Sequence, residues 1–147
     1  MSAKLLWKAR YGVGLEQIDE QHQMFFRMLN AMDDMAAKGD LRRPAVLPIL
    51  HSLNDYAFYH FACEEEYLQR YRYPHFALHR KKHDRFRSRI AAFLQDAESP
   101  EADIPSLAPR IFTYAREWLL HHILVEDKKC EPFFRKGNEL PLGLRGP

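Results

Sequence analysis

The sequence has few cysteines, no long apolar run and no excess of charge of either sign. Its two cysteines, Cys63 and Cys130, cannot form the disulfide framework of a small secreted protein, so we expect two reduced thiols. The N-terminal stretch lacks the apolar core of a signal peptide, and no run reaches the roughly 18 apolar residues of a membrane span. We therefore expect a cytoplasmic protein.

The charge distribution argues against polyanionic partners. The chain has 22 Lys and Arg and 20 Asp and Glu side chains, spread throughout, which leave a formal charge of +2. The longest basic cluster is Arg80-Lys81-Lys82. We therefore expect no binding to nucleic acid or to a membrane surface. The exposed faces of the predicted helices carry no long unbroken apolar stripe, which favours a monomer.

Apolar residues instead recur at helical spacing in four segments, and no convincing strand is present. With 147 residues, 46% of them hydrophobic, residues 1–147 are expected to form one domain with a buried core. Short connections favour an all-α, antiparallel up-down four-helix bundle over about residues 16–130, with an N-terminal arm and an irregular C-terminal tail. The predicted helices run from about Glu16 to Ala37, from near Arg43 past Leu68, from about His79 to Phe93, and from about Ser106 to Lys129.

Polar residues interrupt the apolar stripes of all four predicted helices. They are five histidines and two carboxylates: His22, His60 with Glu64, His79 with His83, and His122 with Asp127. Two of these pairs are spaced i,i+4, which places both side chains on one helix face. An unpaired imidazole or carboxylate in a core costs several kcal/mol, and a metal ion would remove that cost.

Seven donors exceed the roughly four that one zinc ion accepts, so they suggest two ions bridged by the carboxylates. Mixed nitrogen and oxygen donors suit iron. A core histidine hydrogen-bonded to a carbonyl would explain any one of these residues alone, but not the set. Spacing leaves one position open, because on an ideal helix Glu126 shares the face of His122, whereas Asp127 lies about 140° away.

Four segments resemble the hemerythrins, particularly the single-domain bacterial ones. They are Ile18-Asp19-Glu20-Gln21-His22, His60-Phe61-Ala62-Cys63-Glu64-Glu65, His79-x3-His83 and Trp118-Leu119-Leu120-His121-His122-Ile123-x3-Asp127, and their order and spacing agree with the family. The similarity extends from about Trp7 to Phe134. The resemblance implies a four-helix bundle with a non-haem di-iron centre that binds O2 reversibly.

Carried over by position, the resemblance implies two oxo- or hydroxo-bridged iron ions. His79, His83 and His122 would ligate one iron and His22 and His60 the other, with Glu64 and Asp127 as bridges. The iron with two histidines would be one ligand short and would take O2 there. If Asp127 bridges, the fourth helix is expected to widen locally as a π turn, a feature common at functional sites.

The resemblance also implies an apolar O2 pocket. Its expected lining residues are Phe25, Phe61, Trp118, Leu119 and Ile123. Phe25 stands where the family often has a smaller aliphatic residue, so the pocket could be tighter or gated. Cys130 stands where tyrosine is usual. Glu65, interpreted as a helix surface acid, could orient a ligand from outside.

The resemblance implies an O2-binding protein rather than an enzyme, acting in oxygen storage, transport or delivery to an oxygen-consuming enzyme. Three alternatives stay open. One is a di-iron enzyme or iron-handling protein that reacts with peroxide or nitric oxide or donates iron, and another is an O2 sensor that signals through a separate partner. The third is a metal-poor bundle that serves as an interaction module, which the iron content of the purified protein would exclude.

Overall fold

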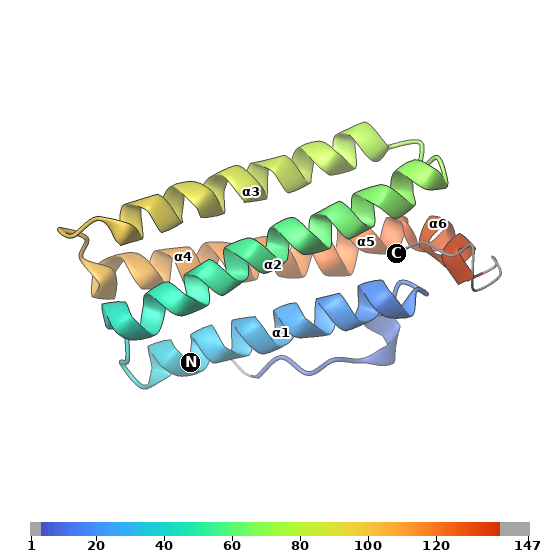
Figure 1. Cartoon of the computed structure of the whole chain (residues 1–147). Helices are drawn as coiled ribbons and strands as arrows, with labels where there is room; N and C mark the ends of the chain where they lie inside the picture. The colour runs from blue at the N-terminus through green and yellow to red at the C-terminus, as the bar shows by residue number, and fades with distance from the viewer. Residues whose placement is uncertain (1–3, 139–147) are drawn as a thin grey trace.

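The computed structural model describes residues 4–138, and four long helices packed side by side make up most of them (Figure 1). Each helix contacts the next in sequence, and the first also contacts the fourth, which closes the bundle. Residues 4–138 contain no strand, and this confirms the all-α four-helix bundle. The helices are α1 (Glu16–Ala37), α2 (Arg43–Arg70), α3 (Phe76–Glu98) and α4 (Ile104–His121), continued by a π turn, η2 (His122–Glu126), and by α5 (Asp127–Lys129).

Turn and capping residues set the helix ends. Gly39, just after α1, has a φ of +69°, a left-handed conformation that glycine adopts without strain. Helix α4 begins at Ile104, two residues before the predicted Ser106. The Asp103 side chain accepts a hydrogen bond from the Ser106 N–H, and Pro105 lies in the first turn, where its missing N–H costs nothing.

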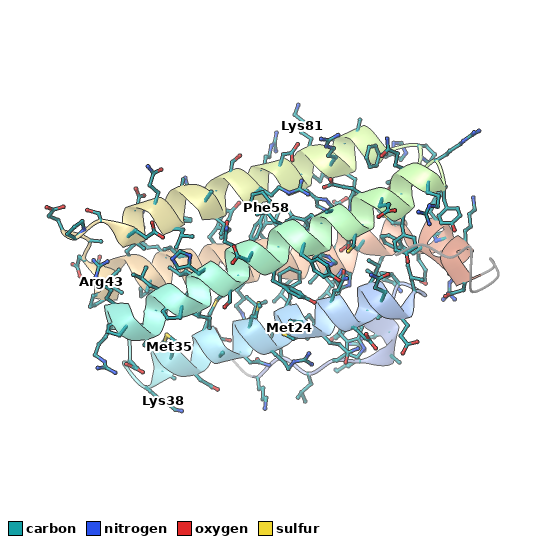
Figure 2. All side chains as sticks on the ribbon, in the orientation of Figure 1. Met24, Met35, Lys38, Arg43, Phe58 and Lys81 are labelled. Carbon is teal, nitrogen blue, oxygen red and sulfur yellow. The ribbon has the colours of Figure 1, made fainter. Side chains whose placement is uncertain are left out.

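An arginine joins the start of α2 to the end of α3. Arg43, labelled in Figure 2 near the turn between α3 and α4, donates Nη1 to the Ala97 carbonyl at 2.9 Å and Nη2 to the Ser99 carbonyl at 2.7 Å. Carbonyls at a helix C-terminus have no partner within the helix, so the guanidinium satisfies groups that would otherwise need water.

The N-terminal arm runs along α1 (Figure 1). Asn30 on α1 accepts the Leu5 N–H at 2.8 Å and donates to the Leu5 carbonyl at 2.9 Å. The Trp7 ring packs edge-on against Phe26, with 5.4 Å between centroids. The arm then forms the short turn η1 (Ala9–Tyr11) before α1 begins.

The region predicted to be an irregular tail starts with two short helical segments, α6 (Glu131–Arg135) and η3 (Lys136–Asn138). Phe134 of α6 is fully buried, and its packing holds this segment against the end of the bundle. The rest of the predicted tail lies outside the described residues. Within residues 4–138, no helix has the length and apolar character needed to cross a membrane.

The core consists of two apolar clusters with a polar layer between them. The larger cluster includes Phe25, Phe61 and Ile123, and the smaller one includes Ile18 and Leu68. On α1, α2 and the fourth helix, the predicted metal donors fall in sequence between residues of the two clusters. The helices therefore bury the donors in a layer with apolar packing above and below.

Candidate metal centre

The polar layer brings together all seven donors predicted from the sequence. Every one is buried, with at most 3% of its surface exposed. The donors are His22 from α1, His60 and Glu64 from α2, His79 and His83 from α3, His122 from the π turn and Asp127 from α5.

Glu64 divides its two carboxylate oxygens between two groups of histidines. Its Oε2 lies 3.0 Å from His22 Nε2 and 2.9 Å from His60 Nε2. Its Oε1 lies 3.1 Å from His83 Nε2 and 3.6 Å from His79 Nε2. One carboxylate thus faces both groups at once.

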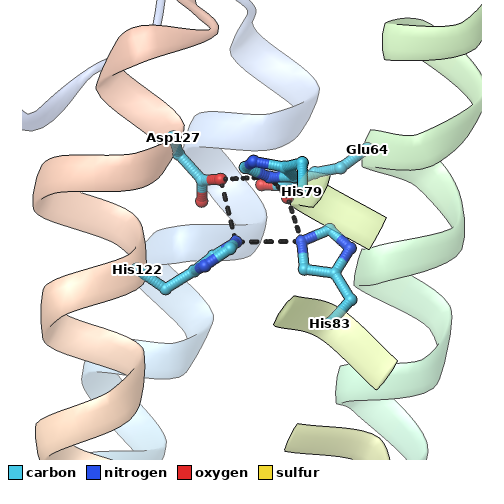
Figure 3. Close-up of side chains that lie close together, drawn as sticks. All are labelled: Glu64, His79, His83, His122 and Asp127. Carbon is cyan, nitrogen blue, oxygen red and sulfur yellow. Dashed lines mark hydrogen bonds and ion pairs between the residues drawn. The ribbon is translucent and has the colours of Figure 1, made fainter. Parts of the chain in front are cut away.

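Asp127 divides its oxygens in the same way. Its Oδ2 lies 3.1 Å from His22 Nε2. Its Oδ1 lies 3.1 Å from His79 Nε2 and 3.2 Å from His122 Nε2, and Figure 3 shows these two contacts. The candidate donor atoms therefore form two adjacent sets that share both carboxylates. One set is Glu64, His79, His83, His122 and Asp127, and the other is His22, His60, Glu64 and Asp127.

The π turn explains why Asp127, and not Glu126, lies in this layer. The Asp127 N–H donates to the His122 carbonyl five residues earlier, so the turn holds one residue more than an α-helical turn and places residues i and i+5 on one face. Glu126 instead forms an ion pair with Lys82 at 2.9 Å. Ideal helical periodicity would place Glu126 on the face of His122, and this is wrong. The π turn that was expected if Asp127 lies there is present.

In two of the histidines, a hydrogen bond at the outer nitrogen, Nδ1, fixes which ring nitrogen carries the proton. His60 Nδ1 lies 2.7 Å from Gln21 Oε1, and His83 Nδ1 lies 2.8 Å from Glu65 Oε2. Both partners are acceptors here, so each Nδ1 carries the proton and each Nε2 presents its lone pair to the layer, as a metal ligand must. Gln21, which is 4% exposed, was not predicted as a site residue, although its position beside His22 in the α1 stripe was a signal.

Several buried atoms of the layer have no hydrogen-bond partner. They include His79 Nε2, Glu64 Oε1 and both carboxylate oxygens of Asp127. Buried polar atoms are rarely left unsatisfied, and buried carboxylates are normally paired with cations or bound to metals. These orphaned atoms point inward, among imidazole and carboxylate donors of the type that iron accepts, so the residues fit a metal centre.

Comparison with known proteins agrees with this geometry. The model of the hemerythrin HHE cation binding domain matches residues 13–134, which include all seven donors. The chain belongs to the hemerythrin family. Bacteriohemerythrin of Methylococcus capsulatus is 32% identical over 131 residues, covering 88% of this chain and 96% of the relative. Bacteriohemerythrin of Stenotrophomonas maltophilia is 30% identical over 126 residues, covering 86% and 78% respectively.

Solved hemerythrin structures have the same fold. The crystal structure of wild-type hemerythrin aligns with a TM-score of 0.78 at 30% sequence identity, covering 90% of this chain and 99% of that one. A leucine-to-alanine mutant of hemerythrin aligns with a TM-score of 0.79. The resemblance on which the sequence interpretation rests is therefore confirmed, and the domain is of a cation-binding type by the family's own description.

In this hemerythrin-family site, close contacts between buried histidines and carboxylates shift the pKa values of both. Burial opposes protonation of His22, yet the neighbouring carboxylates of Asp127 and Glu64 outweigh it and raise the pKa of His22 to about 9. Burial also opposes protonation of His79, but Asp127 is the main partner that raises its pKa to about 12. Although burial disfavours its charge, His60 and other histidines hold the pKa of Glu64 well below its usual range. The carboxylates are therefore ionised.

Aromatic rings cover the histidines of the three-histidine group. Phe61 stacks on His83 with 4.1 Å between centroids and 14° between ring planes. Trp118 stacks on His122 with 4.5 Å and 11°. Both contacts fix ring orientation. Trp118 is half-buried, and both Trp118 and His122 line an open groove of about 410 Å³, although His122 is only 2% exposed.

An apolar side chain packs against His60 of the two-histidine group. Phe25, fully buried, packs edge-on against His60 with 5.1 Å between centroids, and against Tyr56 at 5.2 Å. Leu119 and Ile123, each 1% exposed, belong to the same apolar cluster as Phe25. These placements agree with an apolar wall, and their role in an O2 pocket stays a prediction.

Cys130 lies beside the site and is not exposed. Its Sγ is 3.7 Å from His79 Nδ1, and burial raises the pKa of the thiol. The Tyr73 ring, which comes from the turn between α2 and α3, packs edge-on against His79 at 6.1 Å between centroids. A phenol therefore approaches His79 from another element, although Cys130 stands at the position where tyrosine was expected.

The other histidines lie outside the layer, as expected. His51 is half exposed and pairs with Glu98 at 2.9 Å. His121 is 65% exposed, and its Nε2 lies 3.6 Å from a Glu126 oxygen. His75 is exposed at the start of α3 and makes no capping hydrogen bond with its side chain.

Proposed function

We propose that this chain binds O2 reversibly at a non-haem di-iron centre, for oxygen storage, transport or delivery. The division of donors carries the proposal: the two carboxylates belong to both donor sets, one of which contains three histidines and the other two. Two ions that share both carboxylates would have unequal numbers of histidine ligands. The ion on the side of His22 and His60 would have one protein donor fewer, which leaves a position for O2 there.

The protein holds the donors in place. When bound, two ferrous ions supply the two electrons that O2 takes up and later returns. Gln21 and Glu65 keep the Nε2 lone pairs of His60 and His83 directed at the ions. The apolar wall that includes Phe25 excludes water, which slows irreversible oxidation.

The surroundings favour O2 binding over oxidase or peroxidase chemistry. Gln21 is buried among the donors, and its amide neither gives nor takes a proton at neutral pH. The buried thiol Cys130 has a raised pKa and stays protonated. Consumption of O2 or peroxide needs a proton source at the reacting atoms, and the apolar wall offers none.

We expect the chain to act as a monomer and to pass O2 to an oxygen-consuming enzyme. The test is the visible spectrum of the anaerobically reduced iron-loaded protein through repeated cycles of O2 addition and removal. A charge-transfer band that appears with O2 and disappears when O2 is removed, with its amplitude kept over several cycles, would support the proposal. Prompt irreversible oxidation would contradict it and favour a di-iron enzyme or an iron-handling protein.

A further inference from the structure

The two groups of histidines differ in what their outer nitrogens contact. His83, of the three-histidine group, donates Nδ1–H to the carboxylate of Glu65 at 2.8 Å. His60, of the two-histidine group, donates Nδ1–H to the neutral amide oxygen of Gln21 at 2.7 Å. Both bonds fix the ring, but only the bond to Glu65 places a carboxylate behind it.

The remaining site histidines have no such partner. His79 Nδ1 lies 3.7 Å from the Cys130 sulfur, a weak acceptor. The Nδ1 atom of His22 is buried without a hydrogen bond. His122 makes its carboxylate contact through Nε2, toward Asp127. Of the five site histidines, all within the described residues, only His83 has a carboxylate at its outer nitrogen.

Glu65 is itself paired with an arginine. Arg87 Nη2 lies 2.7 Å from Glu65 Oε2, and the same guanidinium pairs with Asp84 at 2.8 Å. Arg87 also lies over the Phe61 ring, 5.3 Å from its centroid, and Phe61 stacks on His83. Glu65 and Arg87 are 16% and 15% exposed, so water screens this pair less than an exposed one.

Arg87 reaches this position from α3. Its guanidinium also lies over Phe58, which Figure 2 labels on α2, at 5.7 Å from the ring centroid. Contacts with Asp84, Phe58 and Phe61 therefore fix the guanidinium independently of Glu65. The carboxylate is consequently presented to His83 in one geometry.

We infer that Glu65 is a positioning residue. Its charge acts on the site through the hydrogen bond to His83 and makes the metal affinities and reduction potentials of the two metal positions unequal. This inference rests on the proposed di-iron function. A carboxylate that accepts the Nδ1–H of a metal-ligating histidine raises the basicity of the ring, so Nε2 becomes a stronger donor. A stronger donor binds a cation more tightly and stabilises a ferric ion more than a ferrous one. The three-histidine position should therefore have the higher affinity and the lower reduction potential.

The inequality has a functional consequence. The position held by His79, His83 and His122 is fully supplied by the protein, and the carboxylate charge behind it would help that iron to give up its electron when O2 binds at the other position. Glu65 thus sets how readily O2 is taken up, without touching O2. Removal of its charge should weaken O2 binding and slow autoxidation together.

Substitutions at two neighbouring positions test this inference. Glu65→Gln keeps an oxygen acceptor for His83 but removes the charge, whereas Glu66→Gln removes an exposed charge that pairs with Arg70 and does not touch the site. Stepwise Co2+ affinities of the metal-free proteins are measured by competition with a chelator. In Glu65→Gln, one of the two affinities should fall about tenfold to a hundredfold and the other should stay unchanged. Glu66→Gln should match the wild type.

A second readout separates charge from orientation. With iron bound, Glu65→Gln should raise the midpoint potential of one one-electron step by about 60 mV for a tenfold effect. Equal affinities and potentials in the two glutamine variants would overturn the inference. A loss in Glu65→Ala but not in Glu65→Gln would also overturn it, because orientation alone would then matter. If the wild type binds fewer than two Co2+ ions, the di-metal proposal itself fails.

Discussion

Replacement of Phe25 by leucine tests whether the apolar wall controls access to the two-histidine side. Phe25 is fully buried and packs edge-on against His60 and Tyr56 at 5.1 and 5.2 Å between centroids. Leucine removes the ring edge that faces His60 but keeps an apolar side chain in the core. The substitution therefore opens space beside the metal layer without adding a polar group.

The cost in stability follows from the lost carbon atoms. Leucine has three side-chain carbons fewer than phenylalanine, and at about 0.8 kcal/mol per buried carbon group the loss is about 2.4 kcal/mol. At roughly 2–4 °C per kcal/mol for a chain of this size, the melting temperature should fall by about 5–10 °C. A domain stability of about 5–15 kcal/mol leaves the variant folded.

Phe112→Leu is the matched control. Phe112 is 6% exposed in the same apolar cluster, and it precedes His122 by ten residues, or about 15 Å along a helix. Both variants should lose similar stability. Only Phe25→Leu should release O2 faster in stopped-flow measurements and autoxidise faster, because only Phe25 faces the site.

The comparison has a clear negative result. If Phe25→Leu and Phe112→Leu have the same O2 dissociation and autoxidation rates as the wild type, the wall does not control access and the expectation of a gated pocket is wrong. If both variants change these rates equally, general loosening of the core is responsible, and Phe25 has no special role.

Three further predictions concern the metal donors. His60→Ala should lower the iron content or abolish the oxygenated spectrum, and a fully retained chromophore would refute the assignment of His60. Asp127→Ala should lose iron, whereas Glu126→Ala should keep it, since Glu126 pairs with Lys82 outside the layer; the reverse result would show that the π turn was misinterpreted. In the metal-free protein, the pKa of His22 is raised from 6.5 to about 9, so this histidine stabilises the fold fully below pH 6.5 and progressively less up to pH 9. The melting temperature of metal-free protein should therefore fall over that range, and a constant or rising value would contradict the coupling.

The periodic parts of the fold were predictable from the sequence. Helix α1 has the predicted bounds, Glu16–Ala37, because its apolar stripe and the turn at Gly39 agree on where it ends. The start of α4 was placed two residues late, because Pro105 looks like a breaker. It lies instead in the first turn behind the capping residue Asp103, where proline is tolerated.

The π turn marks the limit of periodicity. A 3.6-residue repeat predicts that Glu126 shares the face of His122, and the extra residue of the turn reverses that choice in favour of Asp127. No local propensity reveals such a turn. The family resemblance selected Asp127 because it aligns sequence positions and does not depend on the angle of a side chain around an ideal helix.

Partners of the donors were the least predictable part of the site. Gln21 and His60 are 39 residues apart in sequence. Glu65 on α2 contacts both His83 and Arg87 on α3. Periodicity assigns a side chain to a face, but it does not say which side chain of the neighbouring helix it will meet. These contacts depend on the relative rotation and register of the helices, which only the folded structure gives.

The most direct test of the central claim is an anomalous difference map from crystals of the iron-loaded protein, recorded at the iron absorption edge. Two peaks are expected between the helices, one bonded to the Nε2 atoms of His79, His83 and His122 and the other to those of His22 and His60. Each should also contact one oxygen of Glu64 and one of Asp127. A single peak, or none within this layer, would contradict a di-iron centre in this protein.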